Sequence, residues 1–315
     1  MQRPTVLFYL IGLALVLLGL SVGHALLVLG SSALSLSALR AVGLMAATFL
    51  AVLLELKPTR LAFGREFSEI VLSSAVHLPV LLIAGWPFAV LLAALAAAAS
   101  DIHLGKPWYK AVYNAANGGF SIWLAGNFYS AIVPRHEVSL VTGAPFSLGA
   151  ALAAGLLYTT SNAMLVALPI SAMQGLRYRH LLFTYLRGVA PFFVGVASVS
   201  VAMAALWQLH PASAVLLGPS LFTAKLAYDN YVRLRLETDN FLHALADAVD
   251  LRDPYTAQHS VRVAELARAL GERLGLQGDT LWGLHAVARV HDVGKITVPD
   301  AVLLKAGPLD PPEYE

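Results

Sequence analysis

Long runs of apolar residues before about residue 230 constrain this chain more than any other feature. The C-terminal stretch that follows has the charge density of an ordinary globular domain. Only 13% of the 315 residues are charged and 58% are hydrophobic. A water-soluble domain of this size needs more charge to cover its surface. The contrast predicts two parts, one embedded in a bilayer and one soluble.

A helix needs roughly 20 apolar residues to cross the hydrocarbon core of a membrane. On that scale the sequence predicts eight spans. Only Gly85-Trp86 separates the third from the fourth, which leaves either a tight hairpin or one span with a re-entrant piece. The first run is too long for a signal-peptide core, and we expect it to be retained. The spans are Thr5–Leu29, Ala38–Leu56, Ser68–Ala84, Pro87–Ile102, Trp108–Val133, Pro145–Met173, Phe183–Leu209 and Ala212–Tyr228.

Basic residues orient the predicted bundle, because cytoplasmic loops are enriched in Lys and Arg. With eight spans and a cytoplasmic N-terminus, the outer connections hold only Arg40 and Arg135, and three more basic residues, Lys225, Arg233 and Arg235, accompany the end of the last span on the inside. The inside loops hold Arg3, Lys57, Arg60, Arg65, Lys106, Lys110, Arg177, Arg179 and Arg187. We therefore expect a multi-pass protein of the cytoplasmic (inner) membrane, with both ends and the C-terminal domain in the cytoplasm.

Six polar residues fall within the predicted spans, where such groups usually face the bundle interior. Two interpretations stay open: a pocket for a small ligand or ion, or interhelical hydrogen bonds in a bundle rich in Gly, Ala and Ser. No predicted span has an acidic residue near its centre, and no internal repeat is evident, which disfavours a coupled transporter. The six are His24, His77, Asn114, Asn117, Asn127 and Asn162.

Charge and cysteine content exclude other classes. The formal net charge is +2 and no Lys/Arg cluster resembles a phosphate-tracking patch, so nucleic acid is not an expected partner. The chain has no cysteine, which excludes disulfides, Cys-ligated zinc and iron–sulfur sites.

Residues 229–250 contain neither Gly nor Pro, and we expect the last span to continue through them as one helix. Leu234, Phe241, Leu245 and Ala248 recur at near-heptad spacing. The helix could pair with its copy in a dimer and carry motion to the soluble domain, or it could be the amphipathic first helix of that domain. The sequence favours neither.

The C-terminal segment predicts two further helices. Asp253-Pro254 breaks the preceding helix, because Pro disfavours helical geometry in the residue before it. Apolar periodicity predicts one helix over about Ala257–Leu274, ended by Gly275, and another over about Leu281–His291.

An adjacent pair at the end of the last helix, His291-Asp292, offers one imidazole and one carboxylate to a single divalent cation. His259, near the start of the preceding helix, could reach the same cation from across the helix pair. Such ligands suit Fe, Mn or Zn and, with open positions, an activated water. Gly294 permits a tight turn, which would place the Lys295 charge where a substrate phosphate could sit.

These blocks together resemble the first half of an HD-GYP domain, the bacterial branch of the HD phosphohydrolase superfamily that hydrolyses cyclic di-GMP. The resemblance covers about residues 237–315. It divides the chain into a sensor-like membrane region at 1–228, a linking and signalling helix at 229–250 and a partial HD-GYP domain at 237–315. The matching blocks are Asp253-Pro-Tyr-Thr-Ala-Gln-His259-Ser-Val-Arg262-Val, His291-Asp-Val-Gly-Lys295 and Val298-Pro-Asp-Ala-Val-Leu-Leu-Lys305-Ala-Gly-Pro-Leu309.

The resemblance implies an all-α protein, a polytopic helical membrane bundle followed by a signalling helix and a truncated all-helical HD domain. It implies two or three divalent metal ions, iron or manganese most often, and a bridging hydroxide that attacks phosphorus. Tyr255 stands where some members have an acidic ligand, which favours the binuclear version. By position in the motif, the resemblance makes His259, His291 and Asp292 metal ligands, gives catalytic roles to Asp253 and Lys295, and places Lys295 and Arg262 at the substrate or the site wall.

Family members supply further histidines, an aspartate and the Gly-Tyr-Pro loop after the position of Glu315. Three ligands do not complete a binuclear site, so the resemblance implies a piece of a longer protein or a truncated product. The leading hypothesis is a membrane-bound, homodimeric signalling phosphodiesterase for cyclic di-GMP, in contact with membrane lipid. The alternatives are another HD-superfamily nucleotide phosphohydrolase, a catalytically incomplete sensor or dimerisation module, and, least favoured, a transporter.

Overall fold

The computed structural model divides the chain into two compact units, Met1–Tyr228 (unit 1) and Asp229–Glu315 (unit 2), each of which is described by itself. The residues that the structure describes are 4–31, 46, 49–51, 54–56, 59–63, 66–70, 73–133, 145–175, 177–210, 213, 216–252, 259–276 and 278–314.

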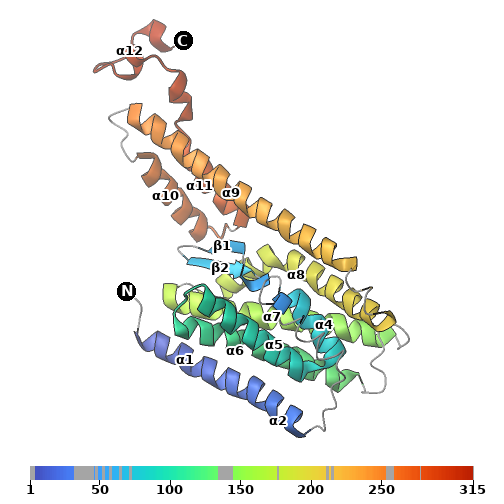
Figure 1. Cartoon of the computed structure of the whole chain (residues 1–315). Helices are drawn as coiled ribbons and strands as arrows, with labels where there is room; N and C mark the ends of the chain where they lie inside the picture. Colours follow the sequence, from blue (N-terminus) through green and yellow to red (C-terminus); the bar gives the residue numbers. More distant parts are fainter. Residues whose placement is uncertain are drawn as a thin grey trace. The chain divides into compact units, whose positions relative to one another are not determined.

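Unit 1 is mainly helical, as predicted (Figure 1). Its first helical stretch passes through a π-helical turn between two α-helices. The two helices at the third and fourth predicted spans meet at Gly85, whose φ is 94°, and pack on each other. The helical elements are α1 (Pro4–Leu18), η1 (Gly19–Gly23), α2 (His24–Ser31), α4 (Ser74–Ala84), α5 (Trp86–His103), α6 (Trp108–Ile132), α7 (Pro145–Gln174) and α8 (Tyr178–Leu209).

A short antiparallel hairpin departs from the all-α prediction. β1 (Thr59–Phe63) pairs with β2 (Glu66–Ile70), with Thr59 opposite Ile70 and Phe63 opposite Glu66. Two short runs separated by two residues that include a glycine are a hairpin pattern, which the span prediction overlooked. Because β2 occupies the start of the predicted span Ser68–Ala84, helix α4 begins only at Ser74.

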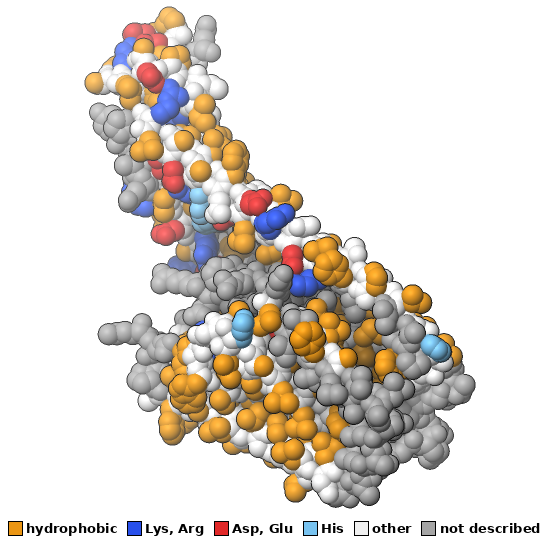
Figure 2. Space-filling model, in the orientation of Figure 1, with side chains coloured by type: hydrophobic (Ala, Val, Ile, Leu, Met, Phe, Trp, Pro, Cys, Tyr) orange, Lys and Arg blue, Asp and Glu red, His pale blue; other side chains and the backbone are white. Residues whose placement is uncertain are grey.

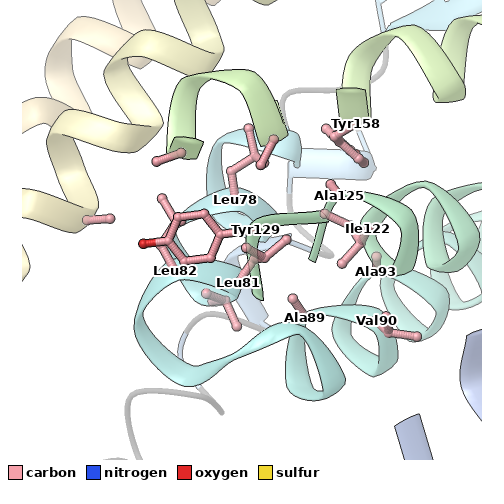
Figure 3. Close-up of a cluster of buried hydrophobic side chains, with 14 of the residues drawn as sticks. Leu78, Leu81, Leu82, Ala89, Val90, Ala93, Ile122, Ala125, Tyr129 and Tyr158 are labelled. Carbon is pink, nitrogen blue, oxygen red and sulfur yellow. The ribbon is translucent and has the colours of Figure 1, made fainter. Parts of the chain in front are cut away.

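The core of unit 1 depends on small residues that let helices approach closely. On α6, a Cβ added at Gly126 would lie 2.1 Å from Cβ of Trp86, and one at Gly119 would lie 3.6 Å from Cβ of Ala94. Close backbone approach of this kind is the main source of packing between helices in membranes. Figure 3 shows the cluster, in which α4, α5, α6 and α7 contribute Leu78, Leu81, Leu82, Ala89, Val90, Ala93, Ile122, Ala125, Tyr129 and Tyr158.

Three described helical stretches are long and apolar enough to cross a membrane: Thr5–Gly30, Trp86–His103 and Ser147–Met173. Two shorter apolar helices, Ser74–Ala84 and Phe193–Leu209, lie at other predicted spans. Helix α6 has the length but not the apolarity, since it carries three of the intramembrane asparagines. The predicted span Ala38–Leu56 falls largely outside the described residues. Eight spans are therefore a proposal rather than a finding.

The described surface of unit 1 carries many large apolar side chains (Figure 2). Phe8, Tyr9 and Leu27 are each 75% exposed. Soluble monomers rarely expose large contiguous apolar patches. The Lys, Arg, Asp and Glu side chains visible in Figure 2 gather on unit 2 instead.

Unit 2 is helical throughout its described residues. Its first helix, α9, is one unbroken helix that begins before the unit boundary. The α10 prediction is confirmed within two residues at its start, and Gly275, with φ 78°, lies two residues beyond its end. The amide of Leu276 donates to the Gly271 carbonyl (2.9 Å), which closes the helix end. The elements are α9 (Gly218–Arg252), α10 (His259–Arg273), α11 (Gly278–Arg289), the 3₁₀ segment η4 (Val293–Thr297), α12 (Asp300–Leu303) and η5 (Pro311–Tyr314).

Helices α10 and α11 pack closely because α10 presents small residues to α11. A Cβ added at Gly271 would lie 2.8 Å from Cδ1 of Leu281 and 2.9 Å from Cδ2 of Leu284. Ala264, two turns earlier on α10, is also buried. This packing sets the start of α10 beside the end of α11, where the predicted ligands lie.

Candidate metal centre

The three predicted metal ligands come together in unit 2. His259 is the first residue of α10, and His291 and Asp292 follow the end of α11. One ligand atom from each side chain lies within 4.8 Å of those of the other two. The imidazole rings of His259 and His291 are 5.3 Å apart, centroid to centroid. The structure thus places the three residues as a ligand set requires, while their role as ligands stays a prediction.

The imidazole of His291 is oriented by its own helix end. Nδ1 of His291 lies 3.0 Å from the carbonyl oxygen of Ala288, which can only accept a hydrogen bond. When Nδ1 donates to that carbonyl, Nε2, which lies 3.3 Å from Oδ1 of Asp292, is the ring nitrogen placed to bind a metal ion. Backbone hydrogen bonds of this kind orient metal-ligating histidines. Two imidazoles and a carboxylate fit a divalent transition metal.

Lys295 contacts the ligand carboxylate directly. Its Nζ donates to Oδ2 of Asp292 at 2.9 Å, and the amide of Lys295 donates to the Asp292 carbonyl at 2.9 Å within η4. The expected tight turn is present, although Gly294 is not among the described glycines with positive φ. Partial burial raises the pKa of Asp292. The hydrogen bond from Lys295 and the charges of His291, Lys295 and His259 outweigh this and hold that pKa below its ordinary value. The carboxylate is therefore ionised at neutral pH, as a ligand must be.

A polar network on α9 supports both ligand-bearing ends. Oγ of Ser260, the residue after His259, donates to Oδ1 of Asp250 at 2.7 Å. Arg289, two residues before His291, is buried and donates to Asp247, with Nη1 3.8 Å from Oδ2 of Asp250. None of these supporting residues was predicted from the sequence to belong to the site. An i,i+3 pair of acidic residues on a helix does not by itself indicate a distant arginine partner.

Arg252, the last residue of α9, fixes the segment after the ligands. Its guanidinium donates to the carbonyls of Ile296 (2.8 Å) and Val298 (3.1 Å), and pairs with Asp300 at 2.5 Å. These bonds hold η4 and the start of α12 against the end of α9.

The roles predicted for three further positions, Asp253, Tyr255 and Arg262, stay untested by the structure. Asp253, predicted to be catalytic, and Tyr255 lie outside the described residues. Arg262 is exposed on α10 and does not belong to the three-residue cluster. Its predicted place at the substrate or the site wall stays a prediction.

Unit 1 contains a separate polar cavity of about 290 Å³. Four of the six polar residues of the predicted spans line it: His77, Asn114, Asn117 and Asn162. The other two make hydrogen bonds within the bundle. His24 Nδ1 accepts from Nε1 of Trp123 at 3.0 Å, and Asn127 donates to the Trp123 carbonyl at 2.8 Å.

The cavity also holds charged groups that the sequence analysis missed. Asp101 is buried and accepts from Nζ of Lys106 (2.5 Å) and Nδ2 of Asn114 (2.6 Å). Glu55 is buried as well. Nδ1 of His77 lies 3.5 Å from the Tyr158 hydroxyl, whereas its buried Nε2 has no hydrogen-bond partner in the described part of the chain.

The HD domain family matches residues 256–314, which contain all three ligand candidates. The 3′3′-cGAMP-specific phosphodiesterase 1 of Vibrio cholerae is 40% identical over 70 residues, 22% of this chain and 16% of that protein. A cyclic di-GMP phosphodiesterase of Thermotoga maritima is 33% identical over 93 residues, 30% of this chain and 24% of that protein. The C-terminal segment carries an HD domain, and its similarity to these phosphodiesterases supports a protein of the HD-GYP family.

A cyclic di-GMP phosphodiesterase response regulator of Xanthomonas campestris is also similar to this HD-GYP segment, at 40% identity over 68 residues, 22% of this chain and 18% of that protein. The chain spans less than a quarter of the length of the curated relatives it matches. No solved structure gives a significant match.

Proposed function

We propose that this chain is the membrane-anchored part of a signalling enzyme whose HD-GYP domain hydrolyses cyclic di-GMP with divalent metal ions. The observation that carries the proposal is the cluster of His259, His291 and Asp292 inside a segment similar to cyclic-dinucleotide phosphodiesterases. Hydrolysis adds one water across a phosphodiester bond and gives linear pGpG, and a second addition gives GMP.

The chain's own residues prepare the site for such a reaction. His259, His291 and Asp292 would hold the metal, iron or manganese, which when bound supplies Lewis acidity toward phosphate and water. The Ala288 carbonyl orients the His291 ring through Nδ1, and Lys295 donates a hydrogen bond to the Asp292 carboxylate. A phosphate that binds beside Asp292 meets the Lys295 ammonium, a compact positive charge. Asp253 and Arg262 are proposed to assist at the catalytic site and its wall.

The proposed location is the cytoplasmic membrane, with eight spans and both ends in the cytoplasm. Three candidate spans and the exposed apolar side chains of unit 1 support it. Because the chain has no cysteine, single introduced cysteines report sidedness cleanly. A membrane-impermeant thiol reagent should label Arg135→Cys from outside intact cells and leave Lys57→Cys unlabelled until the membrane is opened. Labelling of both from outside would contradict the orientation.

The polar cavity of unit 1 supports a sensor role for that unit. A cavity with buried carboxylates, amides and an imidazole nitrogen without a partner among the described residues suits a small polar ligand better than a lipid tail. On this proposal, ligand binding in unit 1 regulates the HD-GYP domain.

Activity is tested with the full-length gene product that carries this chain. We expect Mn²⁺- or Fe²⁺-dependent conversion of cyclic di-GMP to pGpG or GMP, with 3′3′-cGAMP as a parallel substrate because some relatives are named for it. His291→Ala should abolish turnover. His103→Ala is the matched control, since His103 is an exposed histidine of unit 1 outside the metal cluster. No hydrolysis with either metal, or equal turnover in His291→Ala, would refute the proposal.

The second candidate is a sensor or dimerisation module with an incomplete catalytic site. It is favoured by one observation: this cluster supplies three ligands in the described part of the chain, whereas the resemblance implies a binuclear site. Metal analysis of the 315-residue chain separates the two. Near-stoichiometric iron or manganese, lost in His291→Ala, supports a working centre, and none supports the module. Another HD-superfamily nucleotide phosphohydrolase is the alternative chemistry, tested by a panel of nucleotides in the same assay.

A further inference from the structure

Unit 2 contains a second group of metal-ligating side chains, away from the HD motif. Asp239 and His243 lie one turn apart on α9, and His285 lies on α11. One ligand atom from each lies within 4.8 Å of those of the other two. The rings of His243 and His285 are 6.1 Å apart, centroid to centroid. Residues at i and i+4 on a helix share a face, so Asp239 and His243 both turn toward α11.

The His243 imidazole has a nitrogen that the described residues leave unsatisfied. Nε2 of His243 is shielded from solvent and has no hydrogen-bond partner among the described residues. Oδ2 of Asp239 lies 3.9 Å from this nitrogen, which is too long for a hydrogen bond. A cation between the two would satisfy both atoms at ordinary ligand distances.

The space beside this nitrogen is a cavity of about 220 Å³, lined by His243, His285, Glu265 and Arg289 among others. The guanidinium of Arg289 would oppose a cation there if its charge were uncompensated. It is instead paired with Asp247, and Asp250 lies 3.8 Å from its Nη1. Asp247 and Asp250 balance the charge of Arg289, and Glu265 gives the cavity one further carboxylate.

The site can be reached from solvent, because His285 and Asp239 are both only half-buried. An ion can therefore enter without any rearrangement of α9 or α11.

We propose that Asp239, His243 and His285 form a second site for a divalent metal ion such as Zn²⁺. The bound ion would connect helix α9 to helix α11. Two imidazoles and one carboxylate, with open positions for water, select a borderline transition metal over Mg²⁺ or Ca²⁺. Neither histidine belongs to the blocks that carry the HD-GYP resemblance. The site therefore does not depend on the proposed phosphodiesterase activity.

The position of the site gives it a consequence for the HD-GYP domain. Helix α11 ends at Arg289 and leads directly into His291 and Asp292, while α9 is the helix that begins in unit 1. A metal ion bound by both α9 and α11 would hold α11, and the turn with His291 and Asp292 that follows it, against α9. The occupancy of this metal site would determine how strongly a movement of α9 is coupled to the positions of His259, His291 and Asp292.

Zn²⁺ binding to the full chain in detergent tests the site. The HD cluster is removed first with His259→Ala and His291→Ala, and bound metal is then measured after chelator stripping and reloading. We expect about one equivalent of Zn²⁺ to bind in this background. Adding His243→Gln or His285→Gln should weaken that binding by more than about tenfold. Co²⁺ in place of Zn²⁺ should give visible absorption that the same variants lose.

Two further variants guard against loss of structure. Asp239→Asn keeps the shape of the side chain and should also weaken Zn²⁺ binding, while His103→Ala in unit 1 should leave it unchanged. Circular dichroism checks that each variant is helical. The site is refuted if the HD-cluster-free chain binds no Zn²⁺, or if folded His243→Gln and His285→Gln chains retain it. Because no substrate is present, a failure to hydrolyse cyclic di-GMP does not bear on this result.

Discussion

Different kinds of interaction hold each of the two units of this chain together internally. In unit 1 the described core is built mainly from alanine, valine and leucine, and α5 meets α6 where Gly126 leaves room for Trp86. In unit 2 the contacts that α9 makes with the ligand-bearing elements are polar: Asp250 with Ser260, Arg289 with Asp247, and Arg252 with the carbonyls of η4.

The proposed membrane location of unit 1 accounts for this difference. Apolar side chains gain little by leaving lipid for a protein interior, so a bundle in a membrane gains stability from close contact between small residues. In water, hydrogen bonds and ion pairs fix a geometry more sharply than apolar contact does, and a ligand set needs a fixed geometry. Unit 1 should therefore respond most to changes in volume, and unit 2 to changes in charge.

The largest expected effect is on chemistry, and it belongs to unit 2 alone. Asp292→Asn keeps the volume of the side chain but removes the ligand charge and the partner of Lys295. Hydrolysis of cyclic di-GMP by the full-length gene product should fall by roughly a thousandfold. Steady-state assays with Mn²⁺ measure it, with Asp229→Asn, which lies on α9 outside the HD cluster, as the isosteric control. A decrease of less than tenfold would remove Asp292 from the proposed ligand set.

The next effect is a change of volume in unit 1. Gly126→Ala places a Cβ 2.1 Å from that of Trp86, and the overpacked helices should lose about 3 kcal/mol of unfolding free energy. Gly149→Ala on α7 is the matched control, because a Cβ there meets nothing within 4 Å and Ala favours a helix. Thermal unfolding in detergent compares the two. Equal stability would mean that α5 and α6 do not approach as closely as described.

A charge substitution tests unit 2 in the same way. Arg289→Met keeps the bulk of a buried side chain but leaves Asp250 without its nearby cation, and should cost about 2 kcal/mol. Arg268→Met removes an exposed i,i+4 pair with Glu272 and should cost less than about 0.5 kcal/mol. Urea unfolding followed at Trp282 reports on this unit. The idea that charge holds unit 2 fails if the two variants are equally stable.

A smaller effect is expected from the hydrogen bond at the start of α10. Ser260→Ala removes the donor to Asp250 (2.7 Å) and should cost about 1 kcal/mol, since the buried carboxylate keeps Arg289 nearby. Thr238→Ala, exposed on α9, should be neutral. The same urea experiment decides. If Asp250 is the shared anchor, Ser260→Ala combined with Arg289→Met should cost more than the sum of the two single variants.

Most helices could be predicted from the sequence, because each depends on a local pattern. The apolar runs place α5, α6 and α7 within one or two residues, and Gly275 marks the end of α10. The hairpin of β1 and β2 was missed because its residues lie beside an apolar run long enough to suggest a span. The eight-span count exceeds the three stretches that qualify by length and apolarity.

Only the site residues that belong to a sequence motif could be predicted. His259, His291 and Asp292 belong to separate blocks of the HD-GYP pattern, and the structure brings them together. The supporting contacts of Asp247 and Asp250 with Arg289 depend on how α9 lies against α11. The same holds for Asp239, His243 and His285. No periodicity along the chain encodes a pairing between helices that are separated by α10, so these groups become visible only in the folded structure.

The smallest predicted effect is a pH dependence confined to the C-terminal segment. Lys305 donates to Oε2 of Glu313 at 2.6 Å and to Oδ2 of Asp310 at 2.8 Å. The hydrogen bond from Lys305, with a second from the Asp310 amide, lowers the pKa of Glu313 below its ordinary value of 4.5. The folded pKa is therefore below the unfolded one. Its stabilising contribution is complete above the unfolded pKa and is lost as the pH falls through the folded pKa.

Amide hydrogen exchange at η5 measures this effect, since η5 carries Glu313. Protection at residues 312–314 should hold at neutral pH and decrease once the pH falls below about 4. Lys305→Met should reduce both the protection and its pH step, because only the hydrogen bond from the Asp310 amide to Glu313 remains, whereas Lys225→Met on α9 should change neither. If the step is equally large in Lys305→Met, the ion pairs of Lys305 do not hold η5. In that case the charge-based cohesion proposed for unit 2 does not extend to its last described element.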